Sequence, residues 1–412
     1  MSEKRGVRSL VLGAVLAAGL ALPAQAQVKL AFIDPLSGPG GGIGDLALKH
    51  FQFMAEEMNA RGTQKYEVTG YDSKGNPQEA LIQAQKAIDG GARIISQGAG
   101  SAVTAALIDY LNKHNQRNPD RRAILLNWSG ADDVFVNDKC SYWHFRFEAG
   151  NAIKLQVATD EIKNRPQTRK VYLINQDYSS GQAVRATARD MLAKKRPDIE
   201  IVGDEVHPLM KITDFSPYIA KIRASGADAV ITSDWGQDMA LLLKAAGEAK
   251  LDVDWYAFYA GGPGGATLMK QADLPHRVFT VLEGYGNVDS PELRGLERKF
   301  RAKYKQGFTF PKIATEMQML DKAISTGGSA DAAKVAEKLE DMKVAVVSGG
   351  GGFMRKRDHQ LFEPLYVASF GPLGANEPFD EEGTGWGWHT IRRVSADDTV
   401  VPSTCTMTNR PN

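Results

Sequence analysis

The stretch VKLAFIDPLSGPGGGIGD, residues 28–45, joins an apolar run to a glycine-rich loop and then to the start of a helical pattern. A strand that enters a helix through such a loop is the repeating unit of an α/β sheet. Five glycines stand between Gly38 and Gly44, and their density raises the question of a phosphate-binding loop. The stretch therefore indicates the fold class and leaves its chemistry open.

Neither common phosphate signature fits these glycines. Started at Gly38, the dinucleotide pattern G-x-G-x-x-G ends on Ile43, and Pro39 lacks the N–H that a phosphate cradle uses. A P-loop needs Lys and a hydroxyl residue after its last glycine, whereas Gly44 is followed by Asp45. We therefore expect the glycines to let the backbone approach an organic ligand or a facing lobe closely, and to expose amides at a helix start.

The same alternation of strands and helices continues in two series. The first series predicts strands at 28–34, 66–72, 93–98 and 123–127, with helices at 44–60, 77–89 and 103–115. The second predicts strands at 170–176, 199–207, 228–234, 255–260 and 277–283, with helices at 180–195, 215–224 and 237–249. Residues 290–340 read as mostly helical, and later strands are expected at 344–348, 365–370 and 385–395, the last fitting either lobe. The chain is too long for one ordinary core, so two consecutive doubly wound parallel sheets in two lobes are expected.

Residues 1–26 have the pattern of a cleaved secretory signal. A basic start precedes the apolar run SLVLGAVLAAGLAL, and a small-residue cleavage site ends at Ala26. The run is shorter than the roughly 20 residues that cross a bilayer. No cysteine lies near the cleavage site to carry a lipid, so we expect an exported, unanchored chain that starts near Gln27.

The charge balance argues against nucleic-acid binding. The chain has 50 Lys and Arg residues against 49 Asp and Glu residues. Removal of 1–26 takes away three bases and one acid, which leaves the mature chain close to neutral. The signs are interspersed without the basic stripe that contacts phosphate backbones, and we exclude nucleic acid as a partner.

Cys140 and Cys405 are the two cysteines of the chain. Their spacing does not fit the C-x-x-C pattern of zinc or thiol-exchange sites. In an oxidising compartment they permit one disulfide, which we expect to hold the polar tail SADDTVVPSTCTMTNRPN against the body. Closing so long a loop restricts the unfolded chain by roughly 4 to 5 kcal/mol in the chain-entropy account. The alternative is two unpaired thiols.

Ligands of open α/β sheets bind beyond the carboxyl ends of the strands, where loops and helix N-termini meet. Small residues, hydroxyls and single aromatics recur at these ends. The stretches are QGAGSAVT (97–104), NWSGADD (127–133), NQDYSSG (175–181), SDWGQDM (233–239) and FYAGGPGG (258–265). We expect the ligand site to be built from them.

Five stretches, taken in order, resemble the periplasmic solute-binding proteins of the branched-chain amino-acid type, the Leu/Ile/Val-binding family of ABC importers. They are residues 28–45, YDSKGNPQEALIQAQKAI (71–88), NQDYSSGQAV (175–184), TDFSPYIAKIRASGADAVI (213–231) and FMRKRDHQLFEPLYV (353–367). The resemblance covers nearly the whole mature chain. It implies the type I periplasmic-binding-protein fold, in which two doubly wound parallel-sheet lobes joined by a three-crossing hinge close over a solute.

This resemblance also implies an organisation and a function. The expected parts are a signal over 1–26, an N-terminal lobe of 27–148 plus 284–358, and a C-terminal lobe of 149–283 plus 359–412. The protein is expected to be a periplasmic monomer without a cofactor, which captures a small-molecule solute and delivers it to an inner-membrane ABC permease. The alternative is a ligand-sensing subunit that presents its closed form to a membrane receptor. In the basic stretch MRKRDHQ, which lies near a lobe crossing in that family, we expect hydrogen-bonded Asp358 and His359.

The family's ligand site can be assigned where its motifs match this chain. The resemblance implies that the turn after the third strand holds a ligand carboxylate by amides and a hydroxyl, and that aromatic residues wall the cleft. The implied ligand-binding residues are Ser101, Ala102, Thr104, Trp128, Ser129, Ala131, Tyr178, Trp235 and Tyr259.

One departure from the family bears on the ligand. Where amino-acid binders place an acid for the ligand ammonium, this chain has Tyr259, Ala260 and Gly261. A buried ammonium without an anionic partner loses several kcal/mol. Either Asp234 or Glu283 supplies the charge, or the ligand has no α-amino group. We favour an organic or aromatic carboxylate in an aromatic-walled cleft, with a branched-chain or other amino acid as the alternative.

Enzyme signatures are weak. The histidines form no H-E-x-x-H motif and no i, i+4 pair, which argues against a zinc site. The stretch GAGSAVT lacks the glycines of G-x-S-x-G, and Ser101 has no evident base. We therefore expect a transport protein and not an enzyme, with an exported α/β enzyme as the last alternative.

Overall fold

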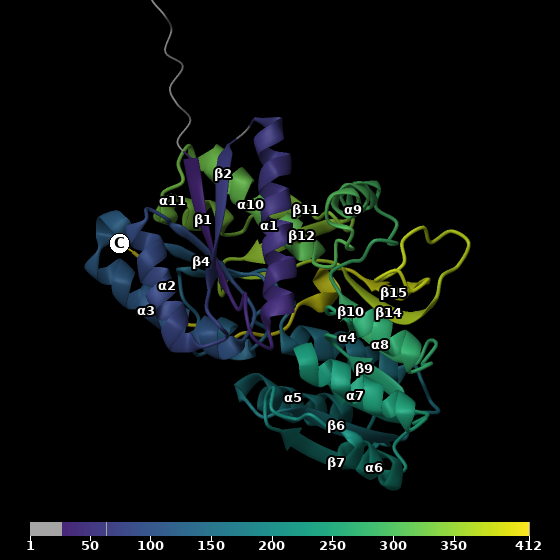
Figure 1. The fold of residues 1–412 in the computed structure, drawn as a ribbon. Helices are drawn as coiled ribbons and strands as arrows, with labels where there is room; N and C mark the ends of the chain where they lie inside the picture. Colours follow the sequence, from purple (N-terminus) through teal and green to yellow (C-terminus); the bar gives the residue numbers. More distant parts are fainter. Residues whose placement is uncertain (1–26, 63, 412) are drawn as a thin grey trace, which may run out of the picture.

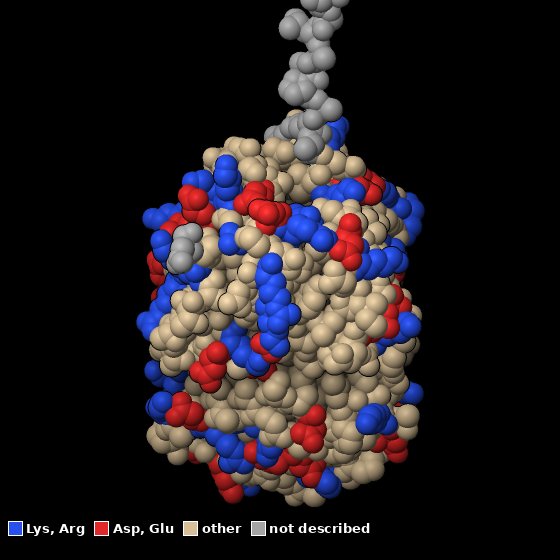
Figure 2. Space-filling view, turned by 90° about the vertical axis from the view of Figure 1, so that its left-hand side faces the viewer, with Lys and Arg blue, Asp and Glu red and all other residues tan. Residues whose placement is uncertain are grey.

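The computed structural model describes residues 27–62 and 64–411. The expected signal segment, residues 1–26, lies outside the described residues. Among the helices of the described part, none combines the length and apolar character needed to cross a membrane. Basic and acidic side chains are interspersed over the face shown in Figure 2, in line with the near-neutral charge balance.

Two mostly parallel sheets form the centres of two lobes (Figure 1). Across the first sheet the strands are β11 (Lys343–Ala345), β12 (Gly351–Arg355), β13 (Gln360–Phe362), β5 (His144–Arg146), β4 (Ile124–Asn127), β3 (Ile94–Gln97), β1 (Gln27–Asp34) and β2 (Lys65–Asp72). Across the second they are β15 (Trp386–Val394), β14 (Leu365–Pro372), β10 (Val278–Leu282), β9 (Asp254–Ala257), β8 (Ala229–Thr232), β6 (Lys170–Gln176) and β7 (Glu200–His207). The late strands β11, β12, β14 and β15 pair antiparallel at the edges.

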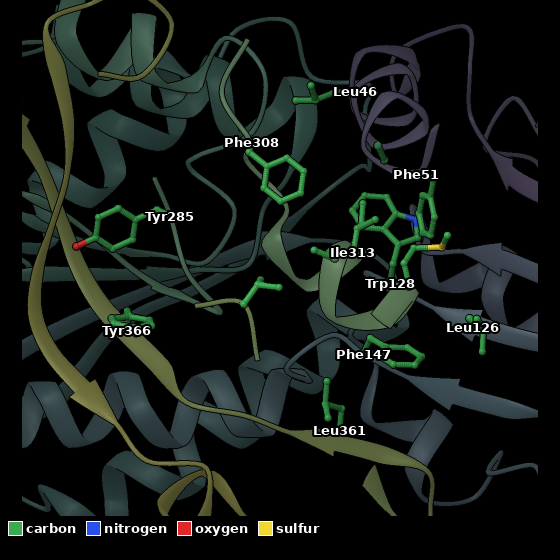
Figure 3. Packing of buried hydrophobic residues seen from close by; sticks show 14 of the residues in the cluster. Leu46, Phe51, Leu126, Trp128, Phe147, Tyr285, Phe308, Ile313, Leu361 and Tyr366 are labelled. Carbon is green, nitrogen blue, oxygen red and sulfur yellow. The ribbon is translucent and has the colours of Figure 1, made fainter. Parts of the chain in front are cut away.

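Helices cover the sheets. Those of the first lobe are α1 (Gly41–Arg61), α2 (Pro77–Asp89), α3 (Ser101–Arg117), α9 (Pro291–Tyr304), α10 (Pro311–Gly327) and α11 (Ala332–Leu339), and those of the second are α4 (Asn151–Lys163), α5 (Ser179–Lys195), α6 (Ser216–Ser225), α7 (Gly236–Glu248) and α8 (Gly265–Gln271). The central strands β3, β4 and β8 are buried along their whole length, because helices lie on both faces of the sheets. In Figure 3, side chains such as Phe51, Trp128 and Ile313 pack into one continuous core.

The predicted alternation of strands and helices is confirmed, and so are two parallel-centred sheets. The strand at 385–395 joins the second sheet as β15. Five strands and helices were not predicted: β5, β12, β13, α4 and α8. Strand β5 spans only three residues, and α4 buries polar side chains such as Lys154 and Glu161, which hides its helical pattern. Helix α8 is a single short segment of seven residues.

The glycine-rich loop serves mainly its own packing. A Cβ at Gly44 would stand 1.9 Å from the carbonyl oxygen of Pro35, and a Cβ at Gly40 would stand 2.9 Å from the ring of Pro35. Glycine at these positions lets α1 begin at Gly41, three residues earlier than predicted, directly against the loop. The expected approach to a facing lobe is looser, since the nearest atom to a Cβ at Gly42 is Pro263 Cβ at 3.9 Å.

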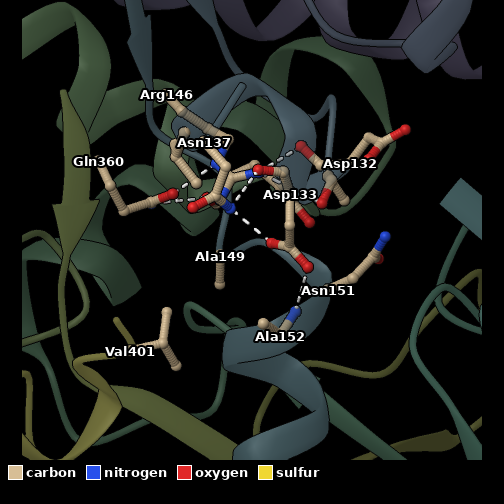
Figure 4. Close-up of polar contacts among 12 residues, drawn as sticks. Asp132, Asp133, Asn137, Arg146, Ala149, Asn151, Ala152, Gln360 and Val401 are labelled. Carbon is tan, nitrogen blue, oxygen red and sulfur yellow. Dashed lines mark hydrogen bonds and ion pairs between the residues drawn. The ribbon is translucent and has the colours of Figure 1, made fainter. Parts of the chain in front are cut away.

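The chain crosses between the lobes at residues 147–150, 283–290 and 363–364. At the first crossing, Arg146 bonds to Gln360 of β13, and Asp133 accepts the N–H of Ala152 in α4 at 2.8 Å (Figure 4). A Cβ at Gly150 would stand 2.3 Å from the Arg146 guanidinium, so the crossing requires glycine there.

The expected boundaries of the second lobe, 359–412, were wrong at both ends. Gln360 pairs with Arg146, which keeps β13 in the first sheet and places the third crossing after Phe362. The C-terminal tail also returns to the first lobe, where Ser403 donates to the carbonyl of Val136 at 2.6 Å.

Cys140 and Cys405 form a disulfide in the structure, with 5.8 Å between their Cα atoms. The bridge joins the tail to the first lobe across a sequence separation of 265 residues. The expected hydrogen bonding of Asp358 and His359 is confirmed: Asp358 accepts from Arg355, and the His359 ring contacts the His144 carbonyl and the Glu340 carboxylate.

Candidate functional site

A cavity lies between the two lobes, where the carboxyl ends of both sheets face each other. The first lobe contributes the turn at 98–101 and the segment around Trp128, and the second contributes the turns that carry Tyr178 and Trp235. Residues 283–286 of the second crossing and the start of α10 also line the cavity. Aromatic side chains make up much of the wall: Trp128, Tyr178, Trp235, Phe258, Tyr259, Tyr285, Phe308, Phe310 and Trp388.

The structure brings together most of the residues that the sequence singled out. Those that line the cavity are Ser101, Trp128, Ser129, Ala131, Tyr178, Trp235 and Tyr259. Ala102 and Thr104 do not line it. Ala102 is exposed, and the buried Thr104 hydroxyl donates to Gln97 Oε1 at 2.7 Å beneath the turn. The expected ligand contact of the Thr104 hydroxyl is not supported, because that hydroxyl is bonded to Gln97, whereas contact through the backbone amide of Ala102 stays a prediction.

Asp34, the last residue of β1, organises the first-lobe wall. Its Oδ1 accepts the backbone N–H groups of Gly98 and Ala99 at 3.2 and 2.9 Å, and the Gln97 side-chain amide at 3.1 Å. Its Oδ2 accepts the indole N–H of Trp128 at 2.7 Å. Burial raises the pKa of Asp34 to about 7, against these four hydrogen bonds. Asp34 was not among the residues predicted from the sequence, although a carboxylate that ends a buried apolar strand is a usable signal.

The N-terminus of α3 opens onto the cavity. Its N-cap is Gly100, at φ +98°, and no side chain caps the helix. The backbone N–H groups of Val103 and Thr104 bond to the Gly100 carbonyl at 3.0 and 3.2 Å. The preceding amides of Ser101 and Ala102 lie before the first intrahelical bond, where a helix binds anions.

The second-lobe wall is built on two further helix starts. Tyr178 and Trp235 are the N-cap residues of α5 and α7, neither of which has a side-chain cap. The Trp235 indole N–H donates to the Tyr178 hydroxyl at 3.2 Å, which fixes the two rings as a pair. From behind, the Gln176 amide donates to the Trp235 carbonyl at 3.1 Å and to Asp238 Oδ2 at 2.8 Å.

The two acids considered as partners for a ligand ammonium lie in different places. Asp234 is buried behind the wall, where its Oδ2 lies 2.7 Å from Nε2 of His207, and it does not line the cavity. Glu283 does line the cavity. Which of the two carboxylates faces the cleft depends on how each strand end is oriented in the folded protein. The sequence alone does not give this orientation.

Each of the crossings at 147–150, 283–290 and 363–364 carries one buried glutamate, and two buried lysines lie among them. The glutamates are Glu148, Glu283 and Glu363, and the lysines are Lys154 of α4 and Lys312 of α10. We call these five residues the hinge cluster. Lys154, Glu283 and Lys312 also line the cavity, so the hinge cluster forms part of its floor.

The ion pairs of the hinge cluster neutralise Glu283. The Lys154 and Lys312 ammonium groups lie 3.7 and 3.4 Å from its oxygens, and the Ala149 N–H donates to it at 3.1 Å. Both lysines also pair with Glu148, Lys154 at 2.9 Å. Although burial acts to raise it, the two ammonium groups hold the pKa of Glu283 at about 2. Burial and the Glu283 charge keep the pKa of Glu363 well above its usual range.

A further carboxyl, Glu381, lines the cavity from the loop between β14 and β15. Burial, together with the nearby Glu297 carboxylate, raises the pKa of Glu381 to about 8. The stretch DEEG (380–383) has the acidic composition that is typical of a solvated loop. No sequence pattern indicated that this loop reaches the cleft.

Residues 27–374 match the model of a protein family described as periplasmic binding protein. Leu/Ile/Val-binding protein homolog 4 of Brucella abortus is 28% identical over 400 residues, which cover 95% of each chain. The closed structure of the leucine-, isoleucine-, valine-, threonine-, and alanine-binding protein from Brucella ovis is 26% identical with a TM-score of 0.84, covering 94% of this chain and 100% of that one. A solute-binding protein of an ABC transporter from R. palustris, solved in complex with benzoate, shares the fold at 16% identity and a TM-score of 0.73, over 85% of this chain and 94% of that one. The chain thus belongs to the periplasmic binding protein family, among the Leu/Ile/Val-binding-like substrate-binding proteins of ABC transporters.

Proposed function

We propose that this substrate-binding protein captures a small organic carboxylate without an α-amino group and delivers it to an inner-membrane ABC permease. The observation that carries the proposal is the state of Glu283, whose carboxylate is already paired with Lys154 and Lys312. A ligand ammonium placed beside Glu283 would lie close to both lysines and would lose its hydration without gaining a free anion. An α-amino group is therefore disfavoured at this point of the cleft.

A ligand carboxylate has a complementary place in the first lobe. The amide of Ser101 and the hydroxyls of Ser101 and Ser129 lie at the cavity wall, beside the positive end of the α3 dipole. Trp128 and Ala131 adjoin them with apolar surface. This arrangement suits a carboxylate attached to an apolar or aromatic body.

The second lobe supplies the opposite wall. Tyr178, Trp235, Phe258 and Tyr259 present ring faces and edges on which an apolar ligand body packs. A ligand touches both walls only when the lobes are closed, so it stabilises the closed state by its extra contacts there. The closed form is what a permease would recognise in this proposal.

The relatives support two ligand classes. The R. palustris neighbour binds benzoate on the same fold, which is consistent with an aromatic carboxylate, although its identity to this chain is only 16%. The Brucella relatives are named for aliphatic amino acids and are more similar, at 28% and 26% identity. Amino-acid capture is therefore the second candidate, and it would require either that Glu283 exchange a lysine for the ligand ammonium or that Glu381 accept this ammonium.

A thermal-shift screen of protein stripped of bound solute by unfolding and refolding tests the choice. The probes are leucine, valine and alanine against the matched 4-methylpentanoate, 3-methylbutanoate, propanoate and benzoate. Tight binding raises the melting temperature by mass action. We expect shifts with the carboxylates. Shifts confined to the amino acids would replace the proposal by the second candidate.

A further inference from the structure

The loop between β14 and β15, residues 373–385, connects the two lobes beside the cavity. Glu382 accepts the N–H groups of Gly264 and Thr267, at the start of α8 in the second lobe, at 2.5 and 2.9 Å. On the other side, Arg301 of α9 in the first lobe bonds to the Asp380 carbonyl, and its guanidinium lies over the ring of Phe379. Figure 1 shows this loop beside α9, on the side of the molecule away from α2 and α3.

Glu381 stands between these two anchored neighbours. Its backbone N–H donates to the Trp386 carbonyl at 2.7 Å, so the main chain is fixed at this point. Its side chain is half-buried and lines the cavity. Within residues 27–62 and 64–411, the Glu381 carboxyl makes neither a hydrogen bond nor an ion pair. The neighbouring charges are engaged elsewhere, since Glu297 is bound by Arg301 and by the Phe308 N–H.

An unpartnered carboxyl in a closing cleft has an energetic consequence. While the cleft is open, water satisfies it. When the lobes close over a ligand, that water is displaced, and a polar group left without a partner costs about 1–3 kcal/mol. The ligand itself must supply the hydrogen bond if closure is to remain favourable.

We propose that Glu381 is a specificity-determining residue, which accepts a hydrogen bond from a donor group on the ligand, at the end remote from the carboxylate held by Ser101. The inference rests on the proposed function and narrows it to carboxylates that carry a distal hydroxyl or amino group. Glu381 and Ser101 both line the cavity, and the loop that carries Glu381 lies on the side of the molecule away from α3, the helix that begins at Ser101. Purely apolar carboxylates of the same shape would leave Glu381 unsatisfied.

The test compares matched ligands that differ only in the distal group. The first series is hexanoate, 6-hydroxyhexanoate and 6-aminohexanoate, and the second is 3-phenylpropanoate, 3-(4-hydroxyphenyl)propanoate and 3-(4-aminophenyl)propanoate. Calorimetric titration of the stripped protein gives an affinity for each. We expect the substituted member to bind at least tenfold more tightly than its parent in one series or both.

Two variants separate the role of Glu381 from that of its loop. Glu381→Ala should reduce the preference for the substituted ligand to less than twofold. Glu381→Gln keeps an acceptor oxygen but cannot lose a proton to form a carboxylate beside a cation, so it should preserve the preference for a hydroxyl and abolish a preference for an aliphatic ammonium. Glu377→Gln is the matched control, because this carboxylate of the same loop contacts His389 and does not line the cavity; it should leave every ratio unchanged.

The outcomes distinguish the two proposals. An unaltered preference in Glu381→Ala, with carboxylates still bound, would overturn the role of Glu381 and leave the proposed function standing. Equal affinities for parent and substituted ligands in the unmodified protein would do the same. Binding of amino acids in place of all the carboxylates would overturn both proposals together.

Discussion

The indole Nε1 of Trp128 donates a 2.7 Å hydrogen bond to Oδ2 of Asp34, and this bond joins the end of β4 to the end of β1 beneath the cleft. The other oxygen of Asp34 holds the backbone at Gly98 and Ala99, just before α3. One buried carboxylate thus positions both Trp128 of the aromatic wall and the turn at 98–101 in the first lobe. The site depends on the register of three neighbouring strands.

Replacing Asp34 with Asn is expected to weaken ligand binding at least tenfold. The amide nitrogen of Asn cannot accept a hydrogen bond, so either Trp128 or the turn at 98–99 loses its partner, at a cost of about 1–3 kcal/mol. Calorimetric titration with the ligand found in the screen measures the effect. Asp45→Asn, an exposed change on α1, serves as the control. Unchanged affinity in Asp34→Asn would mean that Asp34 does not organise the site.

Trp235→Ala is expected to weaken ligand binding more than tenfold while the protein stays folded. Trp235 lines the cavity and is only half-buried in the structure, so its ring is available to a ligand. Trp386→Ala is a matched tryptophan control, because that ring packs on Phe370 and lies outside the cavity. Calorimetric titration measures the ligand affinity of both variants, and circular dichroism verifies that they are folded. Equal affinity in the two variants would remove Trp235 from the site.

The ion pairs of the hinge cluster predict that replacing Lys312 strongly destabilises the folded protein. Replacing Lys312 with Met leaves Glu148 and Glu283 with one lysine between them, and breaking a buried pair in this way costs about 3–5 kcal/mol. Adding Glu283→Gln to the same chain should recover part of the loss, because it removes the uncompensated charge. Urea denaturation of the two single variants and the double variant measures the coupling. Additive losses would show that the pair is not coupled.

The burial of His50 predicts that the free energy of unfolding falls in acid. Its ring packs between Phe300 and Phe308, its Nδ1 bonds to the Leu46 carbonyl at 2.7 Å, and burial lowers its pKa from 6.5 to about 3. Between pH 3 and 6.5 the unfolded chain binds a proton that the folded chain does not, so the free energy of unfolding falls as the pH falls. The slope is about 1.4 kcal/mol per pH unit for this group.

A comparison at pH 7 and pH 5 isolates this contribution. From pH 7 to pH 5 the free energy of unfolding should fall by about 2 kcal/mol more in the unmodified protein than in His50→Gln. Urea denaturation at both pH values measures this difference. His389→Gln changes a half-buried histidine of β15 that lies outside this aromatic cluster and serves as the control. Identical pH dependence in the protein and in His50→Gln would show that His50 does not titrate in this way.

The Cys140–Cys405 bridge predicts that no free thiol is found under denaturing, non-reducing conditions. Two free thiols would contradict it. Replacing both cysteines with Ser should lower the free energy of unfolding by roughly 4 to 5 kcal/mol in the chain-entropy account, because the closed loop is long. Binding of the ligand should change little, since the bridge lies on the first lobe away from the cavity lining.

The order of strands and helices could be predicted from the sequence because it is a local property. An apolar run such as 170–176 predicts a buried strand, and the helical periodicity of 237–249 predicts a helix with one buried face. The alternation of such strands and helices along the chain predicts parallel sheets. The strand-end turns could be predicted as the site for the same reason, since the topology of an α/β sheet brings those ends together. The turns that carry Ser101, Trp128 and Trp235 were found in this way, and the resemblance to the family singled out these three residues within them.

Contacts between distant parts of the chain decided the rest. Lys312 meets Glu148 across 164 residues, and Glu381 reaches the cleft from a loop whose composition resembles any solvated loop. Whether Asp234 or Glu283 faces the ligand depends on which side of a strand end is covered by His207. The sequence by itself determined the fold and the position of the cleft, because the spacing of apolar residues within each short segment predicts its secondary structure and its buried face. The charges that line the cleft were decided only by the tertiary structure, because each depends on a partner that the chain brings from far away.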